Sequence, residues 1–154
     1  MAPLTRRKLP QRDPLPDAKR HSEGFRRTRE VQRTALLEDY AELIADLIDS
    51  GGEARQVDIA SRLGVSQPTV AKMLQRMIAE ELVVQKPYRG VFLSESGARM
   101  AHLSRDRHQI VESFLEEIGV GADTARIDAE GIEHHVSAET LEAFRRFLRR
   151  AKTR

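Results

Sequence analysis

Glu130, Glu133 and His134 are residues of the types that bind divalent metal ions, and on a helix they would lie together. At about 100° per residue, the three side chains fall within an arc of roughly 100° on one helix face. Two carboxylates held together without a cation repel each other, and a divalent metal relieves that repulsion. Because such metals accept oxygen and imidazole ligands, the spacing predicts a metal site. Taken alone, it is also compatible with a solvated acidic face or a helix end that binds no metal.

Three further candidate donors lie elsewhere in the chain and are weaker signals by themselves. Asp39 and Glu42 are three residues apart in a segment without Lys or Arg, so they share a helix face that solvent alone could satisfy. His108 stands alone in a later helical pattern and, judged by itself, favours a surface position. The chain has no cysteine, which excludes thiolate metal ligands, a cysteine nucleophile and disulfides.

The composition indicates a helical globular protein with a basic N-terminal arm. The chain has 154 residues, 40% of them hydrophobic and 32% charged, enough for one full domain or two small ones. Residues 1–33 carry ten Lys/Arg and four Asp/Glu, whereas residues 34–154 carry sixteen and twenty, so the arm is +6 and the body −4. No apolar run approaches the roughly 20 residues of a membrane-spanning helix, and no signal peptide is recognisable. We therefore expect a cytoplasmic protein without a membrane partner.

The first part of the arm is rich in proline and basic residues, which predicts disorder over residues 1–24. The pattern turns helical from about Ser22, with apolar residues at three- and four-residue steps as far as Ile48. Gly51 and Gly52 are expected to end that helix.

A helix-turn-helix pattern follows. Residues 57–63 predict a short first helix, Gly64 supplies the tight turn, and Val65 is expected to pack inward. Ser66 is a good N-cap for the second helix, and Pro68 fits its first turn, where a missing N–H costs nothing. The outward side chains of the second helix are polar or basic, which suits the major groove of DNA. The DNA-binding residues predicted in this segment are Ser66, Gln67, Thr69, Lys72 and Arg76.

Two β-rich runs flank the turn at residues 87–90 and predict a β-hairpin. Lys86 and Arg89 lie at its tip, where they could reach phosphate or the minor groove. A hairpin after a recognition helix is the wing of a winged helix. We therefore predict a mainly α protein, with a winged helix-turn-helix DNA-binding domain over residues 25–97 and a helical metal-binding and dimerisation domain over residues 98–154.

Three helices are predicted after the hairpin. Ser94 is the expected cap of the first, which runs to Ile118, and the others span residues 122–135 and 138–151. The last helix carries an apolar stripe that indicates a dimer interface, and a twofold protein binds a twofold DNA site.

Five segments resemble the manganese-responsive transport regulators of the diphtheria-toxin-repressor family, and their spacing also fits. They are LLEDYAELIADLI, ARQVDIASRLGVSQPTVAKML, YRGVFLSESG, RHQIVESFL and DAEGIEHHVS, which together cover most of residues 34–140. The resemblance implies two close manganese ions per subunit, bound between the first helix of the DNA-binding domain and the dimerisation domain. The ligands implied are Asp39, Glu42, His108, Glu130, Glu133 and His134.

The resemblance further implies a homodimeric, Mn(II)-dependent DNA-binding regulator, chiefly a repressor of manganese uptake genes, with no organic cofactor and no enzymatic activity. Iron-responsive relatives carry a methionine where this chain has Asp39 and a cysteine where it has Glu130, and hard oxygen ligands favour Mn(II). Three alternatives remain open: an Fe(II)-responsive regulator, a metal-independent winged-helix regulator that senses a small molecule, and a binuclear metallohydrolase. Sensitivity of specific DNA binding to EDTA separates the second from a metal sensor, and turnover assays with Mn(II) test the third.

Overall fold

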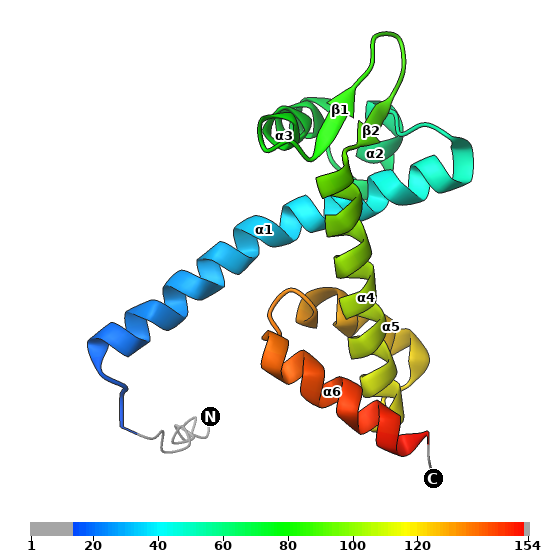
Figure 1. Ribbon diagram of the computed structural model, residues 1–154. Helices are drawn as coiled ribbons and strands as arrows, with labels where there is room; N and C mark the ends of the chain where they lie inside the picture. Colours follow the sequence, from blue (N-terminus) through cyan, green and yellow to red (C-terminus); the bar gives the residue numbers. More distant parts are fainter. Residues whose placement is uncertain (1–13, 153–154) are drawn as a thin grey trace, which may run out of the picture.

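The computed structural model describes residues 14–152, which form six α-helices and one two-stranded sheet. The helices are α1 (Ala18–Gly51), α2 (Gln56–Leu63), α3 (Gln67–Ala79), α4 (Glu95–Glu117), α5 (Ala122–Ile132) and α6 (Ala138–Ala151), and the strands are β1 (Val83–Gln85) and β2 (Val91–Leu93). The predicted mainly helical class is confirmed. In Figure 1, α2, α3 and the hairpin gather at the C-terminal half of the long helix α1, and α4 runs from the hairpin past α1 to α5 and α6.

Helix α1 begins earlier than predicted. Asp17 caps its start at Ala18, so residues 18–24 are helical, and the prediction that they are disordered is wrong. Pro16 is the last proline of the arm, and Lys19 and Arg20 after it are good helix formers, so the helix can start here despite Gly24. The prediction of disorder for residues 1–13 lies outside the described residues.

One continuous core joins the C-terminal half of α1 to the helix-turn-helix and the hairpin. Ile44 of α1, Ile59 of α2, and Val70 and Met77 of α3 are fully buried within it. Each such side chain contributes about 1.5–3 kcal/mol relative to leaving it exposed. The core therefore makes α1 a rigid part of the unit that carries α3, so any group that holds α1 also orients α3.

The turn between α2 and α3 follows the predicted chemistry, with one exception. Gly64 adopts a left-handed φ of 66°, and the Ser66 hydroxyl accepts a hydrogen bond from the Thr69 amide, which caps α3. The prediction that Val65 packs inward is wrong, because 38% of it is exposed. Its amide bonds back to the Ala60 carbonyl at the end of α2, but its side chain is not covered by the helices on either side of the turn.

The hairpin meets α4 through a close backbone contact. Strand β1 pairs antiparallel with β2, with Val84 opposite Phe92. Ser94 caps α4 as predicted, by accepting a hydrogen bond from the Gly97 amide. A Cβ atom at Gly97 would lie 2.0 Å from the carbonyl oxygen of Leu82, so only glycine permits α4 to start this close to the hairpin.

Helix α6 packs against α4 of its own chain. The ring of Phe144 stacks on Phe114 with centroids 3.9 Å apart, and Phe147 meets the same ring edge-on at 5.3 Å. The stripe predicted to lie at a dimer interface is thus partly used within the chain. Helix α5 instead exposes apolar side chains, with Ile127 68% and Ile132 37% exposed. Within residues 14–152, no helix is both long enough and apolar enough to cross a membrane.

Candidate functional site

The six side chains predicted as metal ligands come together where α1, α4 and the end of α5 meet. Donor atoms of His108, Glu130 and Glu133 all lie within 4.8 Å of one another. From the α1 side, Oδ1 of Asp39 lies 3.1 Å from Nε2 of His134. The groove between these elements is lined by Asp39, Glu42, Leu43, Asp46, Leu63, Glu130 and His134.

The turn after α5 supplies two of the six side chains. Helix α5 ends at Ile132, so the prediction that it continues to His135 is wrong. Gly131 and the histidine pair that follows are weak helix formers, which accounts for the early end. Glu133 is the C-cap residue and is 1% exposed at its side chain, whereas the side chain of Glu130, near the end of α5, is 67% exposed.

The carboxylate of Glu133 is buried without a hydrogen-bond donor. Neither of its oxygens accepts a hydrogen bond from the described residues. Nδ1 of His108 lies 2.9 Å from Oε2, but this contact is an ion pair only when the imidazole is protonated. Burial, and then the negative charge of Glu42, raise the pKa of Glu133 to about 8. Burying an unpaired polar group costs about 1–3 kcal/mol, and more when it is charged, so the site favours a cation at this carboxylate.

His134 is held at both ring nitrogens. Nδ1 lies 2.8 Å from Oε2 of Glu38, and Nε2 lies 3.1 Å from Oδ1 of Asp39. The hydrogen bonds to Asp39 and Glu38 raise the pKa of His134 to about 10, although burial acts against this. A metal ion at Nε2 would therefore replace a proton, while the contact at Nδ1 can persist.

Glu38 and its partner Arg107 also belong to the site and were not predicted from the sequence. An Arg107 guanidinium nitrogen lies 2.7 Å from Oε2 of Glu38. Burial opposes ionisation of Glu38, but the hydrogen bond from His134 and the charge of Arg107 together outweigh it and lower the pKa of Glu38. Glu38 lies in the acidic segment that also supplies Asp39, yet its two partners come from α4 and from the turn after α5. No local pattern reports such contacts.

The residues present fit a divalent metal ion. The donors are carboxylate oxygens and imidazole nitrogens without sulfur, a set that hard and borderline cations accept. Burial raises the pKa of Glu42, and the nearby negative charges of Glu130 and Asp39 raise it further. The Ser104 hydroxyl and His108 act to lower the pKa but do not outweigh these effects. The site thus gathers more negative charge than its own cationic groups balance.

A second polar surface lies at the start of α3. Gln67, Thr69 and Lys72 are exposed there, and the hydroxyls of Ser66 and Thr69 lie 2.8 Å apart. Arg76 is half-buried and pairs with Glu80 at 2.8 Å, which turns its charge towards the C-terminal end of the helix.

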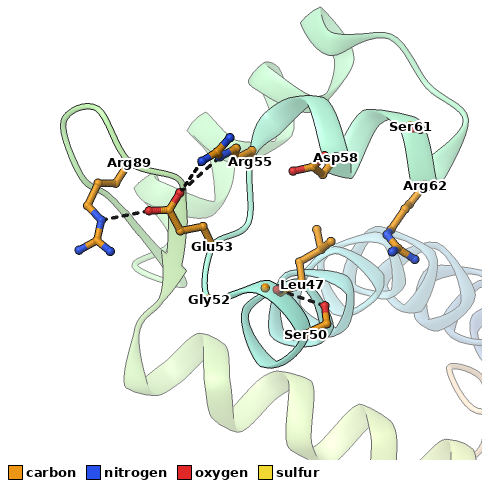
Figure 2. A pocket seen from close by; sticks show the side chains of 10 residues that line it. Leu47, Ser50, Gly52, Glu53, Arg55, Asp58, Ser61, Arg62 and Arg89 are labelled. Carbon is orange, nitrogen blue, oxygen red and sulfur yellow. Dashed lines mark hydrogen bonds and ion pairs between the residues drawn. The ribbon is translucent and has the colours of Figure 1, made fainter.

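The two wing cations are both engaged within the chain. Nε of Arg89 lies 3.1 Å from Glu53, which also pairs with Arg55 at 3.2 Å, and Figure 2 shows Glu53 between the two arginines. Pairing with Arg89 and Arg55 lowers the pKa of Glu53. Nζ of Lys86 lies 4.6 Å from the ring centroid of Phe92, which keeps the lysine at the wing.

Two family models match successive parts of the chain. The model described as the N-terminal DNA binding domain of the iron dependent repressor matches residues 33–91. The model described as its metal binding and dimerisation domain matches residues 94–154. Together they include every residue predicted as a metal ligand or DNA contact.

Curated relatives match over most of their length. The transcriptional regulator MntR of Escherichia coli O6:H1 is 58% identical over 136 residues, which is 88% of each chain. That of Salmonella typhimurium is 56% identical over 139 residues, which is 90% of this chain and 88% of the relative.

Solved structures share the fold. The manganese regulator SloR superposes with a TM-score of 0.65 at 30% identity, over 73% of this chain and 53% of SloR. A manganese-dependent transcriptional repressor complexed with manganese gives 0.59 at 27% identity, over 70% of this chain and 50% of the repressor. The chain spans about half the length of these two solved proteins.

Proposed function

Because the chain belongs to the iron-dependent repressor family, and is therefore a metal-dependent DNA-binding transcriptional regulator rather than an enzyme, we propose that it responds to manganese and represses manganese uptake genes. The observation that carries this proposal is the buried carboxylate of Glu133, unpartnered among oxygen and nitrogen donors. Two structural neighbours, the manganese regulator SloR and a manganese-dependent transcriptional repressor, support the same choice of metal. Because the protein binds DNA, we infer that it acts in the cytoplasm.

In the proposed mechanism, the six donors would hold two Mn(II) ions per subunit, and the charge of the ions would balance the carboxylates. Asp39 and Glu42 belong to α1, which shares a core with α3, while the other donors belong to α4 and the end of α5. Ligation from both sides at once would fix α1 against α4 and α5. The α3 helices of a dimer are then held at the spacing of two half-sites. Coupling is reciprocal, so DNA should raise metal affinity by a typical ~1–3 kcal/mol.

The dimer contact in this proposal is the exposed face of α5. Ile127, Ile132 and Val136 line a groove there, together with Gly131, Asp128 and His135. Apolar side chains of this kind are common at the centre of homodimer interfaces.

Glu130→Ala tests the metal site. We expect the variant to remain a folded dimer but to lose metal-dependent operator binding, because Glu130 is exposed and contributes a donor rather than packing. The loss should exceed the roughly 10–100-fold that removal of an outer-shell partner costs. Fluorescence anisotropy of operator DNA against free Mn(II), at fixed salt, measures it, with Glu116→Ala on the exposed face of α4 as control. A variant with the wild-type Mn(II) dependence would refute the site.

The same titration with Fe(II) and Zn(II) addresses the alternative metal. The descriptions of both matching family models name an iron dependent repressor, and Fe(II) accepts the same oxygen and imidazole ligands. Activation by Fe(II) at lower free concentration than by Mn(II) would assign the protein to iron.

For the DNA surface, we propose that the N-terminal part of α3 contacts base edges and that the wing and Arg76 hold phosphates. The base contacts are supported by the exposure of the polar side chains at the start of α3. The phosphate contacts are supported by the position of Lys86 and Arg89 at the tip of the hairpin. The base-contacting set is Ser66, Gln67, Thr69 and Lys72, and the phosphate-contacting set is Arg76, Lys86 and Arg89.

Glu53→Gln should strengthen DNA binding. In the wild type, Arg89 must leave Glu53 before it can meet a phosphate. Exposed ion pairs contribute roughly 0–1 kcal/mol, so the gain should be a few-fold and similar for specific and nonspecific DNA. Anisotropy at several salt concentrations measures both affinity and salt slope. Glu95→Gln, which releases Arg99 at the start of α4, is the matched control, and equal behaviour of the two variants would contradict the prediction.

A further inference from the structure

The geometry points to Glu38 as a positioning residue that sets the tautomer and ring orientation of His134 and so prepares the metal site. The inference rests on the proposed metal site and adds a residue that is not itself a ligand. Nδ1 of His134 lies 2.8 Å from Oε2 of Glu38, and both side chains are largely buried, at 7% and 15% exposure. The two residues are 96 positions apart in sequence, so the contact is made only by the tertiary fold.

The two ring nitrogens of His134 face different surroundings. Nε2 points to the ligand group, 3.1 Å from Asp39 and 3.5 Å from Glu133. A neutral imidazole carries its proton on one nitrogen and offers a lone pair on the other. When Nδ1–H donates to Glu38, the lone pair lies at Nε2, where a metal ion shared with Asp39 and Glu133 would meet it. A carboxylate on the second nitrogen of a metal-binding histidine also raises its basicity as a ligand.

Glu38 is placed to hold histidine rather than metal. It does not line the groove shared by Asp39, Glu130 and His134. Its negative charge is already matched by Arg107, 2.7 Å away. Arg107 precedes His108 on α4, so one guanidinium fixes Glu38 from the helix that also supplies a ligand. The contacts from Arg107 to Glu38 and from Glu38 to His134 therefore link α4, α1 and the turn after α5.

An ordinary brace between α1 and α4 is the competing explanation, and the chain offers a control for it. Arg105 pairs with Asp46 and joins the same two helices, and no hydrogen bond or ion pair joins it to a histidine within residues 14–152. If Glu38 only braces, Arg105→Gln should do similar damage to metal binding. If Glu38 positions His134, only changes at Glu38 should alter the imidazole.

Two variants at Glu38 separate charge from hydrogen bonding. Glu38→Gln keeps an oxygen that can accept from Nδ1–H but removes the negative charge, and Glu38→Ala removes both. We expect Mn(II) affinity, measured by calorimetry on the full chain without DNA, to fall about 10–100-fold in Glu38→Ala and by less in Glu38→Gln. Arg105→Gln should stay within about twofold of wild type. Thermal unfolding of each metal-free variant shows whether it is folded.

A spectroscopic measurement tests the tautomer directly. In long-range ¹H–¹⁵N spectra of protein loaded with diamagnetic Cd(II), wild-type His134 should show a metal-bound Nε2 and a protonated Nδ1. In Glu38→Ala the signals should shift or broaden, while those of His108 should change little. Wild-type Mn(II) affinity and an unchanged His134 spectrum in a folded Glu38→Ala would overturn the inference, as would equal losses in Arg105→Gln. Failure of the wild type itself to bind Mn(II) would instead overturn the proposed function.

Discussion

Glu133→Gln is expected to abolish metal-dependent DNA binding and, at the same time, to stabilise the metal-free protein. The carboxylate is 1% exposed and lacks a hydrogen-bond donor, so it opposes folding whenever it is ionised. The amide has nearly the same shape but no charge to bury. We expect a gain on the order of 1–3 kcal/mol in unfolding free energy at pH 8, together with loss of the rise in Tm that Mn(II) gives the wild type.

The pH dependence of this effect follows from the raised pKa values. For Glu133 the pKa rises from 4.5 to about 8 on folding, so its contribution to stability is fully present below pH 4.5 and is lost as pH rises through about 8. For His134, raised from 6.5 to about 10, the contribution is full below pH 6.5 and is lost by about pH 10. The metal-free wild type should therefore lose stability as pH rises from about 4.5 to about 10, and Glu133→Gln should lose less. Because ligands must be deprotonated, Mn(II) affinity should rise over the same range.

Urea unfolding at several pH values, with and without Mn(II), measures both effects. Glu117→Gln is a suitable control because this glutamate lies exposed at the end of α4. A Glu133→Gln protein that is less stable than the metal-free wild type at pH 8, or that is still stabilised by Mn(II), would contradict the prediction.

Gly97→Ala is expected to be the most damaging single-methyl change in the DNA-binding half. The added Cβ would lie 2.0 Å from the carbonyl oxygen of Leu82 and 3.0 Å from its carbon, and both are backbone atoms that cannot rotate away. Helix α4 would have to move off the hairpin, which breaks the Ser94 cap and shifts the helix that carries His108. We expect a loss of about 3 kcal/mol or more in unfolding free energy.

Denaturant unfolding measures this loss, and Gly24→Ala is the matched control. No atom lies within 4 Å of a Cβ at Gly24, which is in the exposed first half of α1, so alanine should be neutral or stabilising by up to about 1 kcal/mol. A wild-type midpoint for Gly97→Ala would show that the contact between α4 and the hairpin is not fixed.

Elements defined by adjacent residues were predictable, because their physics is local. The left-handed turn at Gly64 and the caps at Ser66 and Ser94 follow from the preferences of single residues, and the structure contains them. The burial of Val65 depends on how the surrounding helices pack, and the end of α5 depends on weak competing propensities, so both predictions were wrong.

In the candidate site, too, the residues close together in sequence were predictable and the contacts between distant residues were not. Spacing alone grouped Glu130, Glu133 and His134, whereas the remaining ligands joined them only through the family resemblance. Partners such as Glu38 and Arg107 could not be found from sequence, because their contacts join residues 69 and 96 positions away from Glu38. Such pairs depend on how helices cross, and periodicity within one helix carries no information about crossing.

Four consecutive residues of α4, Arg105 to His108, have partners in three different parts of the fold. Arg105 and Arg107 each pair with a carboxylate of α1, Asp106 pairs with an arginine of α6, and His108 faces the turn after α5. One residue inserted or deleted between Gly97 and Arg105 would rotate all four by about 100° and shift them by 1.5 Å along the axis. Every one of these partners would then be missed at once. The number of residues in this stretch of α4 should therefore be invariant among functional homologues, while length changes should be confined to loops such as the one after Glu117.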